Sequence, residues 1–311
     1  MAVPKLVTFD ASAPLEEMVA VMKRDGGLIV RNFLSAENLE EMQRVIVPLV
    51  DASTVDEEDG LKEVGEGFVP SHTKRVYGLL GCAPVPISKV IQDKVWQGLM
   101  GTFLSAEVQT YTGKQLVVQK TGFQLNATVA VTAMPGSTAQ ALHRDQVLHA
   151  FQAEENSLKT SMVGCLIALS DITEENGGTA VIPGSHLWPP SRAPDESECT
   201  YTEMAAGSAL FTLGSVYHGA DANRSKPSSP NSTRTLINVF GTHDWLRQEE
   251  NMYATVPLEV ARTLPEEVLR LSGWAKGAGG CGFVNHRDPI DFIHKPELEK
   301  MSLGFAPVAT A

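Results

Sequence analysis

"QLVVQKTGFQLNATVAVTAMPG", residues 115–136, is the stretch that decides the fold class. It is rich in valine and threonine, which favour strands, and Gly122 and the Pro135–Gly136 pair interrupt it. Similar short apolar segments follow between glycines, prolines and acidic turns. They are "SMVGCLIALSDI" (161–172), "GTAVIPGS" (178–185), "SALFTLGSVYHGA" (208–220) and "RTLINVFGT" (234–242). The pattern predicts a mainly β domain, a sandwich or barrel, with its core over about residues 115–245.

The residues before this core alternate between helical and strand patterns. "PLEEMVAVMKRDG" (14–26) predicts an amphipathic helix that ends at Gly26, and "GLIVRNFL" (27–34) predicts a short strand. "SAENLEEMQRVIVPLV" (35–50) predicts a second helix with Ser35 as its N-cap. The acidic stretch 51–67 predicts a solvent-facing loop, and residues 85–108 predict a further helical region. We therefore expect one domain, with a helical N-terminal part over 1–110, the β core, and a C-terminal region over about 246–311.

The composition is that of a soluble globular protein. Of 311 residues, 43% are hydrophobic and 20% are charged, and the formal net charge is −12. That negative charge argues against nucleic acid as a partner, and the lack of any 18-residue apolar run argues against a membrane span. The first residues are acidic where a secretion signal needs an apolar core. Four cysteines stand far apart with no CxxC pair, which favours reduced thiols and a cytoplasmic location.

The segment "ALHRDQ" (141–146) places His143 and Asp145 two residues apart. Such a pair has three interpretations: two metal ligands, a general acid/base pair, or only a salt bridge that involves Arg144 at the end of a strand. His218 follows 73 residues after Asp145, at the end of another apolar segment. In an antiparallel double sheet, remote strands end side by side at one mouth, so these three residues form a two-histidine, one-carboxylate face. That face suits iron(II) with three open positions, and zinc is the rival metal.

Arg234 stands 16 residues after His218, at the start of the next apolar segment. Facing inward, its guanidinium would hold a carboxylate through two hydrogen bonds. An open iron face and a buried arginine together suit a 2-oxo acid, whose keto end chelates the metal while its far carboxylate is bound by the arginine.

Four segments together resemble a known family: "AQALHRDQ", "ITEENGGTAVIPGSHLWP", "YHGADANR" and "RTLINVF". From about residue 10 to residue 300, the chain resembles the phytanoyl-CoA dioxygenases, which depend on iron(II) and 2-oxoglutarate. Within that family it is most similar to the fungal branch that oxidises meroterpenoids and alkaloids. The resemblance implies a cupin-like jelly roll, also called a double-stranded β-helix.

Carried over residue by residue, the resemblance makes His143, Asp145 and His218 the iron ligands and Arg234 the salt-bridge partner of 2-oxoglutarate. A longer segment over residues 225–233 precedes Arg234 and leaves Arg224 as the alternative. Three further residues match groups that assist binding of the cosubstrate: Gln140, Thr179 and Arg75.

The implied function is oxidation by molecular oxygen of a small polycyclic substrate, with a meroterpenoid first and an alkaloid second. Hydroxylation, desaturation, rearrangement and endoperoxide formation all remain open as outcomes. One alternative is an acyl-CoA hydroxylase, which a chain of charge −12 without a basic cluster disfavours. Another is a jelly-roll binding protein without catalysis. The resemblance also implies a homodimer, in which the C-terminal region supplies the lid and subunit contacts.

Overall fold

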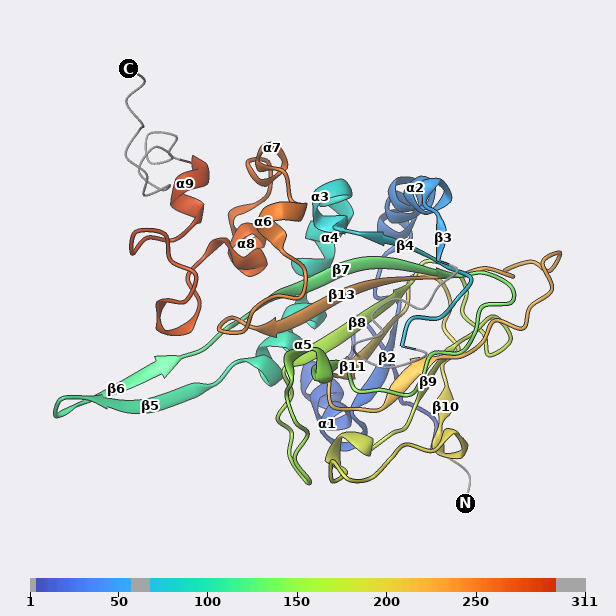
Figure 1. Ribbon diagram of the computed structural model, residues 1–311, viewed down its shortest axis with the longest axis horizontal. Coiled ribbons are helices and arrows are strands. Elements are labelled where there is room, and N and C mark those ends of the chain that lie inside the picture. The colour runs from blue at the N-terminus through green and yellow to red at the C-terminus, as the bar shows by residue number, and fades with distance from the viewer. Residues whose placement is uncertain (1–3, 57–67, 295–311) are drawn as a thin grey trace.

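A large mixed sheet is the frame of the structure, a computed structural model that describes residues 4–56 and 68–294 (Figure 1). β1 and β2 pair in parallel, whereas the other neighbours in this sheet are antiparallel. In spatial order the strands are β1 (Thr8–Asp10), β2 (Gly27–Arg31), β11 (Ala209–Leu213), β8 (Met162–Ala168), β13 (Arg234–His243), β7 (Phe123–Ala133), β4 (Thr73–Tyr77) and β3 (Val55–Asp56).

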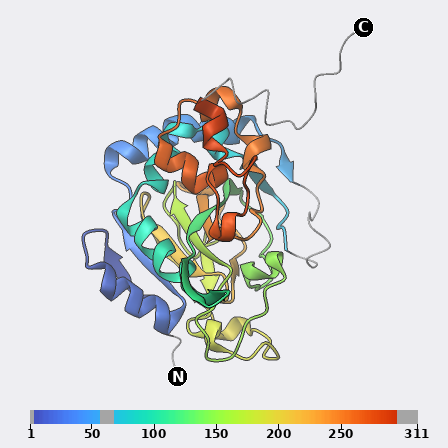
Figure 2. The same ribbon diagram turned by 90° about the vertical axis from the view of Figure 1, so that its left-hand side faces the viewer.

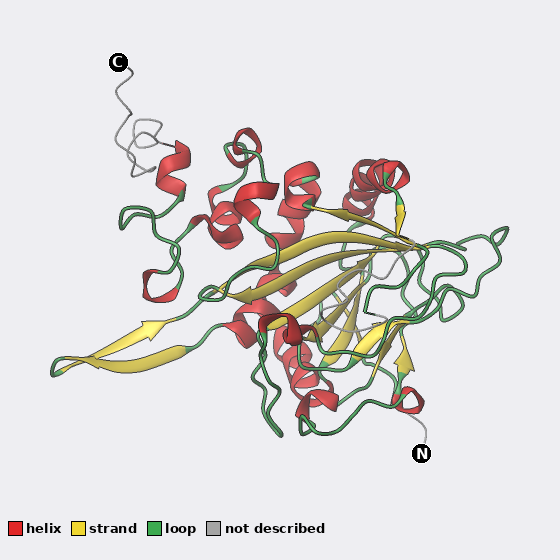
Figure 3. Ribbon diagram, in the orientation of Figure 1, coloured by secondary structure: helices red, strands yellow, loops and turns green. Residues whose placement is uncertain are grey.

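A smaller sheet and a projecting hairpin complete the strands of the described residues. The small sheet has the order β10 (Thr200–Tyr201), β9 (Thr179–Val181) and β12 (His218–Ala220). The hairpin of β5 (Glu107–Thr112) and β6 (Gln115–Lys120) extends away from the body of the molecule (Figure 3).

The large sheet is buried on both faces, and β8 shows why. Its side chains alternate between a core shared with the helices, which receives Val163 and Ile167, and a second core shared with the small sheet, which receives Leu166 and Ala168. A strand buried on both faces needs apolar residues at every position, which explains the continuous apolar run in this segment. The molecule is therefore layered as helices, large sheet and small sheet (Figure 2).

The helices lie at positions that local signals fix. The predicted helix over 14–26 is α1 (Leu15–Asp25), and it ends at Gly26 with a left-handed φ of 77°. A Cβ at Gly26 would lie 2.6 Å from Nδ1 of His186, so the position needs glycine for space as well as for conformation. The predicted N-cap Ser35 accepts the Asn38 amide at the start of α2. The bounds of α2 to α9 are Ala36–Ala52, Leu79–Cys82, Pro84–Ile91, Lys94–Leu104, Met252–Thr255, Leu258–Ala261, Glu266–Leu269 and Ile290–His294.

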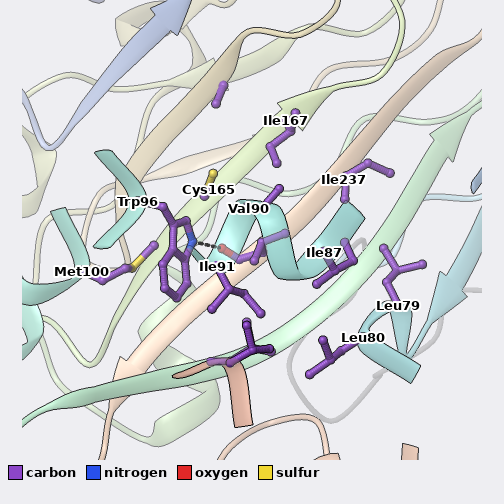
Figure 4. Close-up of a cluster of buried hydrophobic side chains, with 14 of the residues drawn as sticks. Leu79, Leu80, Ile87, Val90, Ile91, Trp96, Met100, Cys165, Ile167 and Ile237 are labelled. Carbon is purple, nitrogen blue, oxygen red and sulfur yellow. Dashed lines mark hydrogen bonds between the residues drawn. The ribbon is translucent and has the colours of Figure 1, made fainter. Parts of the chain in front are cut away.

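Trp96 anchors the helix-side core (Figure 4). Asp93 caps α5 by accepting the amides of Val95 and Trp96, which fixes the first turn of this helix against the sheet. The Trp96 ring is fully buried, and its Nε1 donates a hydrogen bond of 3.1 Å to the Val239 carbonyl of β13. The helical layer is thereby tied to the strand that also carries Arg234.

Two sequence expectations differ from the structure. The region expected to be helical over 85–108 contains α4 and α5, but its helical part ends at Leu104, and β5 begins at Glu107. Ser105 takes an extended conformation, and the threonines and tyrosine that follow favour a strand. The N-terminal part is also less helical than expected, because β1–β4 join the large sheet at its two edges. The acidic loop expected over 51–67 falls mostly outside the described residues, as do residues 295–311.

A β-bulge interrupts the pairing of β7 and β13. Phe240 pairs with Ala127 and Gly241 pairs with Leu125, so Asn126 is an extra residue on β7. The insertion changes which face each side chain occupies. Val129 faces the space between the two sheets, whereas Leu125, another odd-numbered residue, packs in the helix-side core.

The four cysteines, Cys82, Cys165, Cys199 and Cys281, are free thiols. Within residues 4–56 and 68–294, none of the helices combines the length and apolar character needed to cross a membrane. The cytoplasmic location stays a prediction.

Candidate metal centre

The backbone brings His143 and His218 side by side. Each donates its amide to the carbonyl of the other, at 2.9 and 3.0 Å, which forms an isolated antiparallel bridge. Asp145 stands two residues after His143, at the start of a short 3₁₀ helix, η1 (Asp145–His149). The residues that the sequence predicted as ligands therefore meet beside β12.

The side-chain atoms of these three residues converge. His143 Nε2 lies 3.2 Å from Asp145 Oδ1, and His218 Nε2 lies 3.5 Å from Asp145 Oδ2. One ligand atom from each residue falls within 4.8 Å of the others. Within the described residues this is the group of histidine and acidic side chains with the spacing of a metal site.

The other ring nitrogens determine which atoms are available for a metal. His143 Nδ1 lies 2.8 Å from the Ala141 carbonyl, and His218 Nδ1 lies 3.2 Å from the Val216 carbonyl. A carbonyl oxygen only accepts, so each Nδ1 carries the proton in these hydrogen bonds. In a neutral imidazole this leaves the Nε2 lone pair free, and both lone pairs face the Asp145 carboxylate.

Burial sets the charges at this cluster. Asp145 and His218 are each 5% exposed. Burial opposes ionisation of Asp145, but attraction to His218 and His143 when these are protonated, together with a hydrogen bond from His143, holds the pKa of the Asp145 carboxyl below its usual value. Burial lowers the pKa of His218, although the Asp145 charge opposes this change. Asp145 Oδ2 is buried with no hydrogen-bond donor. Two neutral nitrogens and a carboxylate with an unsatisfied oxygen fit a divalent metal of the iron or zinc type.

A cavity of about 210 Å³ opens beside the three residues, between the two sheets. Alternate residues of β13 form one wall: Arg234, Leu236, Asn238 and Phe240. β4 and β7 extend that wall, and β9 and β12 of the small sheet lie opposite. Most of the lining is apolar, as in pockets that bind small organic molecules.

Arg234 lies at one end of this wall. It is 2% exposed, and its Nε is buried without an acceptor. Burial lowers the pKa of Arg234 to about 10, while the Asp221 charge opposes that change. In the described part of the chain, Arg234 forms no ion pair, because Asp221 binds Arg224 instead, at 2.6 Å. A buried guanidinium without a counter-charge is costly, so the geometry favours an anionic ligand at this point.

The other candidates from the sequence take different places. Gln140, Thr179 and Arg75 all line the cavity. Both ends of the Gln140 amide are already bonded, since Nε2 donates to the Phe68 carbonyl and Oε1 accepts the Ala220 amide. Gln140 therefore ties the segment before His143 to β12. The Arg224 side chain is 61% exposed and does not line the cavity.

Asn238 and Glu249 are polar residues of the cavity that were not predicted from the sequence. Asn238 faces inward from β13, and its Oδ1 is buried without a partner. Alternate residues of a strand face the same side, so Asn238 lies on the same face of β13 as Arg234. This alternation could have identified Asn238 from the sequence. Glu249 reaches the cavity from the loop after β13. A loop has no regular alternation of side chains that would predict which of its residues face the cavity.

Comparisons with known proteins agree with this geometry. A profile of the phytanoyl-CoA dioxygenase (PhyH) family matches residues 22–229. The dioxygenase swnH1 of Arthroderma benhamiae is 31% identical, and the match covers 92% of this chain and 91% of that protein.

Two solved structures share the fold. SnoK, an alpha-ketoglutarate-dependent carbocyclase from nogalamycin biosynthesis, has a TM-score of 0.54 and 16% identity over 80% of this chain and 94% of that chain. HygX from Streptomyces hygroscopicus, solved with nickel and 2-oxoglutarate bound, has a TM-score of 0.53 and 14% identity over 76% of this chain and 91% of that chain. At these identities the two structures establish similarity of fold alone.

Proposed function

This chain belongs to the phytanoyl-CoA dioxygenase family, and on that premise we propose that it oxidises a polycyclic secondary metabolite. Its class is that of the non-haem iron(II) and 2-oxoglutarate-dependent dioxygenases. The observation that carries the proposal is one cavity with a ligand cluster, His143, Asp145 and His218, and an unpaired buried arginine. We also infer that the two facing sheets form a jelly roll, which the similarity to SnoK and HygX supports.

The metal ligands follow from the free Nε2 atoms. His143, Asp145 and His218 would hold iron(II), because two neutral imidazoles and one carboxylate leave positions for further ligands. When bound, iron(II) would activate molecular oxygen for oxidation of a C–H bond of the substrate, with 2-oxoglutarate as the source of two electrons. The carbonyls of Ala141 and Val216 hold the imidazole rings in the required orientation. HygX, which shares the fold, has nickel and 2-oxoglutarate bound.

Arg234 would bind the distal carboxylate of 2-oxoglutarate. Its pKa of about 10 keeps it charged at neutral pH, and a carboxylate would neutralise it in a buried site. Thr179 on β9 and Arg75 on β4 line the same cavity and would add polar contacts. Gln140 would act indirectly, by holding the strand segment that leads to His143.

The substrate class rests on the walls of the cavity. Val129, Val131, Leu166 and Phe240 give an apolar lining for a rigid polycyclic skeleton. Family resemblance places a meroterpenoid first and an alkaloid second. An acyl-CoA is the alternative substrate, and the net charge of −12 disfavours its polyanionic coenzyme.

We also propose a homodimer, as the family resemblance implies. The β5–β6 hairpin is an argument for a second subunit, because an isolated two-stranded ribbon is only marginally stable in water and needs a surface to pack against. This hairpin projects from the body of the molecule (Figure 1). Tyr111, Leu116 and Val118 are exposed, and the strand register places them on one face of the hairpin. Light scattering on the purified chain should give twice the monomer mass. A monomer at micromolar concentration would contradict the proposal.

Anaerobic titration with iron(II) and 2-oxoglutarate tests the enzyme class. A chelate of the two gives a weak visible charge-transfer band, which we expect here. A binding protein without metal would take up neither tightly, and a zinc hydrolase would act without oxygen. Incubation in air with meroterpenoids, alkaloids and acyl-CoAs then tests the substrate by release of succinate. Succinate release that is coupled only to an acyl-CoA would overturn the proposed substrate class.

A further inference from the structure

The cavity contains a second charged side chain without a counter-charge, the carboxylate of Glu249. Glu249 lines the same cavity as Arg234 and the three metal-ligand candidates. In the described part of the chain, no lysine, arginine or histidine lies within ion-pair distance of it. Among the described residues, the cavity thus holds a guanidinium, Arg234, and a carboxyl group, Glu249, that form no ion pair with the protein.

The β-bulge places Glu249 far from Arg234. The Asn126 carbonyl accepts the Glu250 amide, and Asn126 lies on the sheet beside the Phe240–Gly241 step of β13. Arg234 and Phe240 are six residues apart on one extended strand, which corresponds to about 20 Å. The two unpaired charges therefore lie toward opposite ends of the cavity wall, and one small dicarboxylate at Arg234 leaves the Glu249 end for another molecule.

Asn126 holds the Glu249 carboxyl group in a fixed orientation. Its Nδ2 donates to Glu249 Oε1 at 2.8 Å, and its Oδ1 accepts the Glu249 amide at 2.9 Å. Asn126 itself is fully buried. Within the described residues, Glu249 Oε2 receives no hydrogen bond, so this oxygen is available to a ligand.

The surroundings of Glu249 favour a cation. The Glu249 side chain is exposed to solvent at the open cavity. Partial desolvation by neighbouring protein atoms raises the pKa of Glu249 to about 7, against the opposing hydrogen bond from Asn126 and with a contribution from the Asp145 charge. A carboxylate in this setting is stabilised most by a ligand that both donates a hydrogen bond and carries positive charge. A hydroxyl group provides only the first.

We propose that Glu249 is the residue that recognises the substrate, and that it binds a protonated amine on a polycyclic skeleton. This inference rests on the proposed function and narrows it, since it favours an alkaloid over a neutral meroterpenoid. The apolar residues Val129, Leu148 and Phe240 contact the ring system, while Glu249 fixes its orientation through the nitrogen. Arg234 and Glu249 then separate two ligands by charge, because the first attracts the anionic cosubstrate and the second repels it.

Binding to the full-length protein loaded with nickel(II) and 2-oxoglutarate tests this inference, since nickel blocks turnover. The probes are a tetrahydro-β-carboline, an ergoline and a yohimban, each beside its neutral N-acetyl or lactam counterpart. Calorimetry should show that at least one amine binds about tenfold or more tightly than its neutral counterpart. Glu249→Gln keeps the shape of the side chain but removes the charge, and it should reduce this preference to near unity.

Glu250→Gln is the matched control. Glu250 is the next residue in the same loop, does not line the cavity, and accepts hydrogen bonds from Thr128, which a glutamine oxygen also accepts. The control variant should keep the preference for the amine. If the neutral counterparts bind as tightly as the amines, if Glu249→Gln keeps the preference, or if no amine binds, the inference is wrong.

Measurement of 2-oxoglutarate affinity in the same samples separates this inference from the proposed function. Glu249→Gln should bind nickel(II) and 2-oxoglutarate as the wild type does, because Glu249 lies at the other end of the wall. Normal cosubstrate binding without a preference for amines would overturn the inference alone. A wild-type protein that takes up neither nickel(II) nor 2-oxoglutarate would overturn the proposed function as well.

Discussion

Replacing Arg234 by leucine should have opposite effects on cosubstrate binding and on stability. A pKa near 10 instead of 12.5 means that the fold disfavours the charged guanidinium by about 3 kcal/mol. Leucine removes this penalty, so Arg234→Leu should stabilise the protein free of 2-oxoglutarate by up to about 3 kcal/mol. Loss of the charge-assisted pair should cost about 2–5 kcal/mol of binding, which corresponds to a roughly 30-fold to several-thousand-fold weaker affinity for 2-oxoglutarate.

Thermal unfolding with and without 2-oxoglutarate measures both effects in one experiment. A ligand that binds only the folded state raises the Tm, so the wild type should gain from 2-oxoglutarate and Arg234→Leu should not. Arg224→Leu is the control, because Arg224 is mostly exposed and already paired with Asp221. Unchanged cosubstrate affinity in Arg234→Leu would refute the reasoning, and a loss confined to Arg224→Leu would transfer the role to Arg224.

Three further predictions concern the metal, the pH and the core. His143→Ala and Asp145→Ala should each abolish tight iron(II) binding and oxygen-dependent turnover, and full activity in either variant would contradict the ligand assignment. Burial lowers the pKa of His186 below 6.5, so the unfolded chain takes up a proton first and stability should fall as the pH drops below about 6.5. Urea unfolding should show this decrease, with a slope of at most about 1.4 kcal/mol per pH unit from this residue, and a flatter profile in His186→Gln. Trp96→Phe removes a buried hydrogen bond and leaves space in the core, so it should cost about 1–3 kcal/mol in the same assay while the affinity for nickel(II) stays constant.

The local elements were largely predictable from the sequence, because local interactions specify them. Ser35 and Gly26 mark helix ends through capping and a left-handed conformation, and both act where the sequence places them. The strands of the β core follow from their apolar, β-branched runs. The first strand of the β5–β6 hairpin was missed because Glu107–Thr112 is mostly polar and each of its residues is exposed, so no alternation of buried and exposed residues identifies it.

The candidate site was predictable in part, for a related reason. His143 and Asp145 are neighbours in the sequence, and the end of an apolar run points to His218. The sequence alone does not show which acidic residue, if any, pairs with a buried arginine. That Arg224 is paired with Asp221 while Arg234 is not became visible only in three dimensions. Glu249 depends on a bulge at Asn126 that no strand period indicates.

That bulge divides the wall of the site into a part that the strand register fixes and a part that it does not fix. The end with Arg234 is built on uninterrupted pairing of β13 with β7, where a shift of one residue would turn every side chain to the wrong face. The position of Glu249 depends on one inserted residue, Asn126, and on the hydrogen bonds between Asn126 and the loop that carries Glu249. Deleting or moving that insertion would redirect Glu249, while the strand pairing that orients Arg234 would stay the same. A fold of this kind lends itself to gene duplication, since copies could keep one chemistry and diverge in the molecules on which they use it.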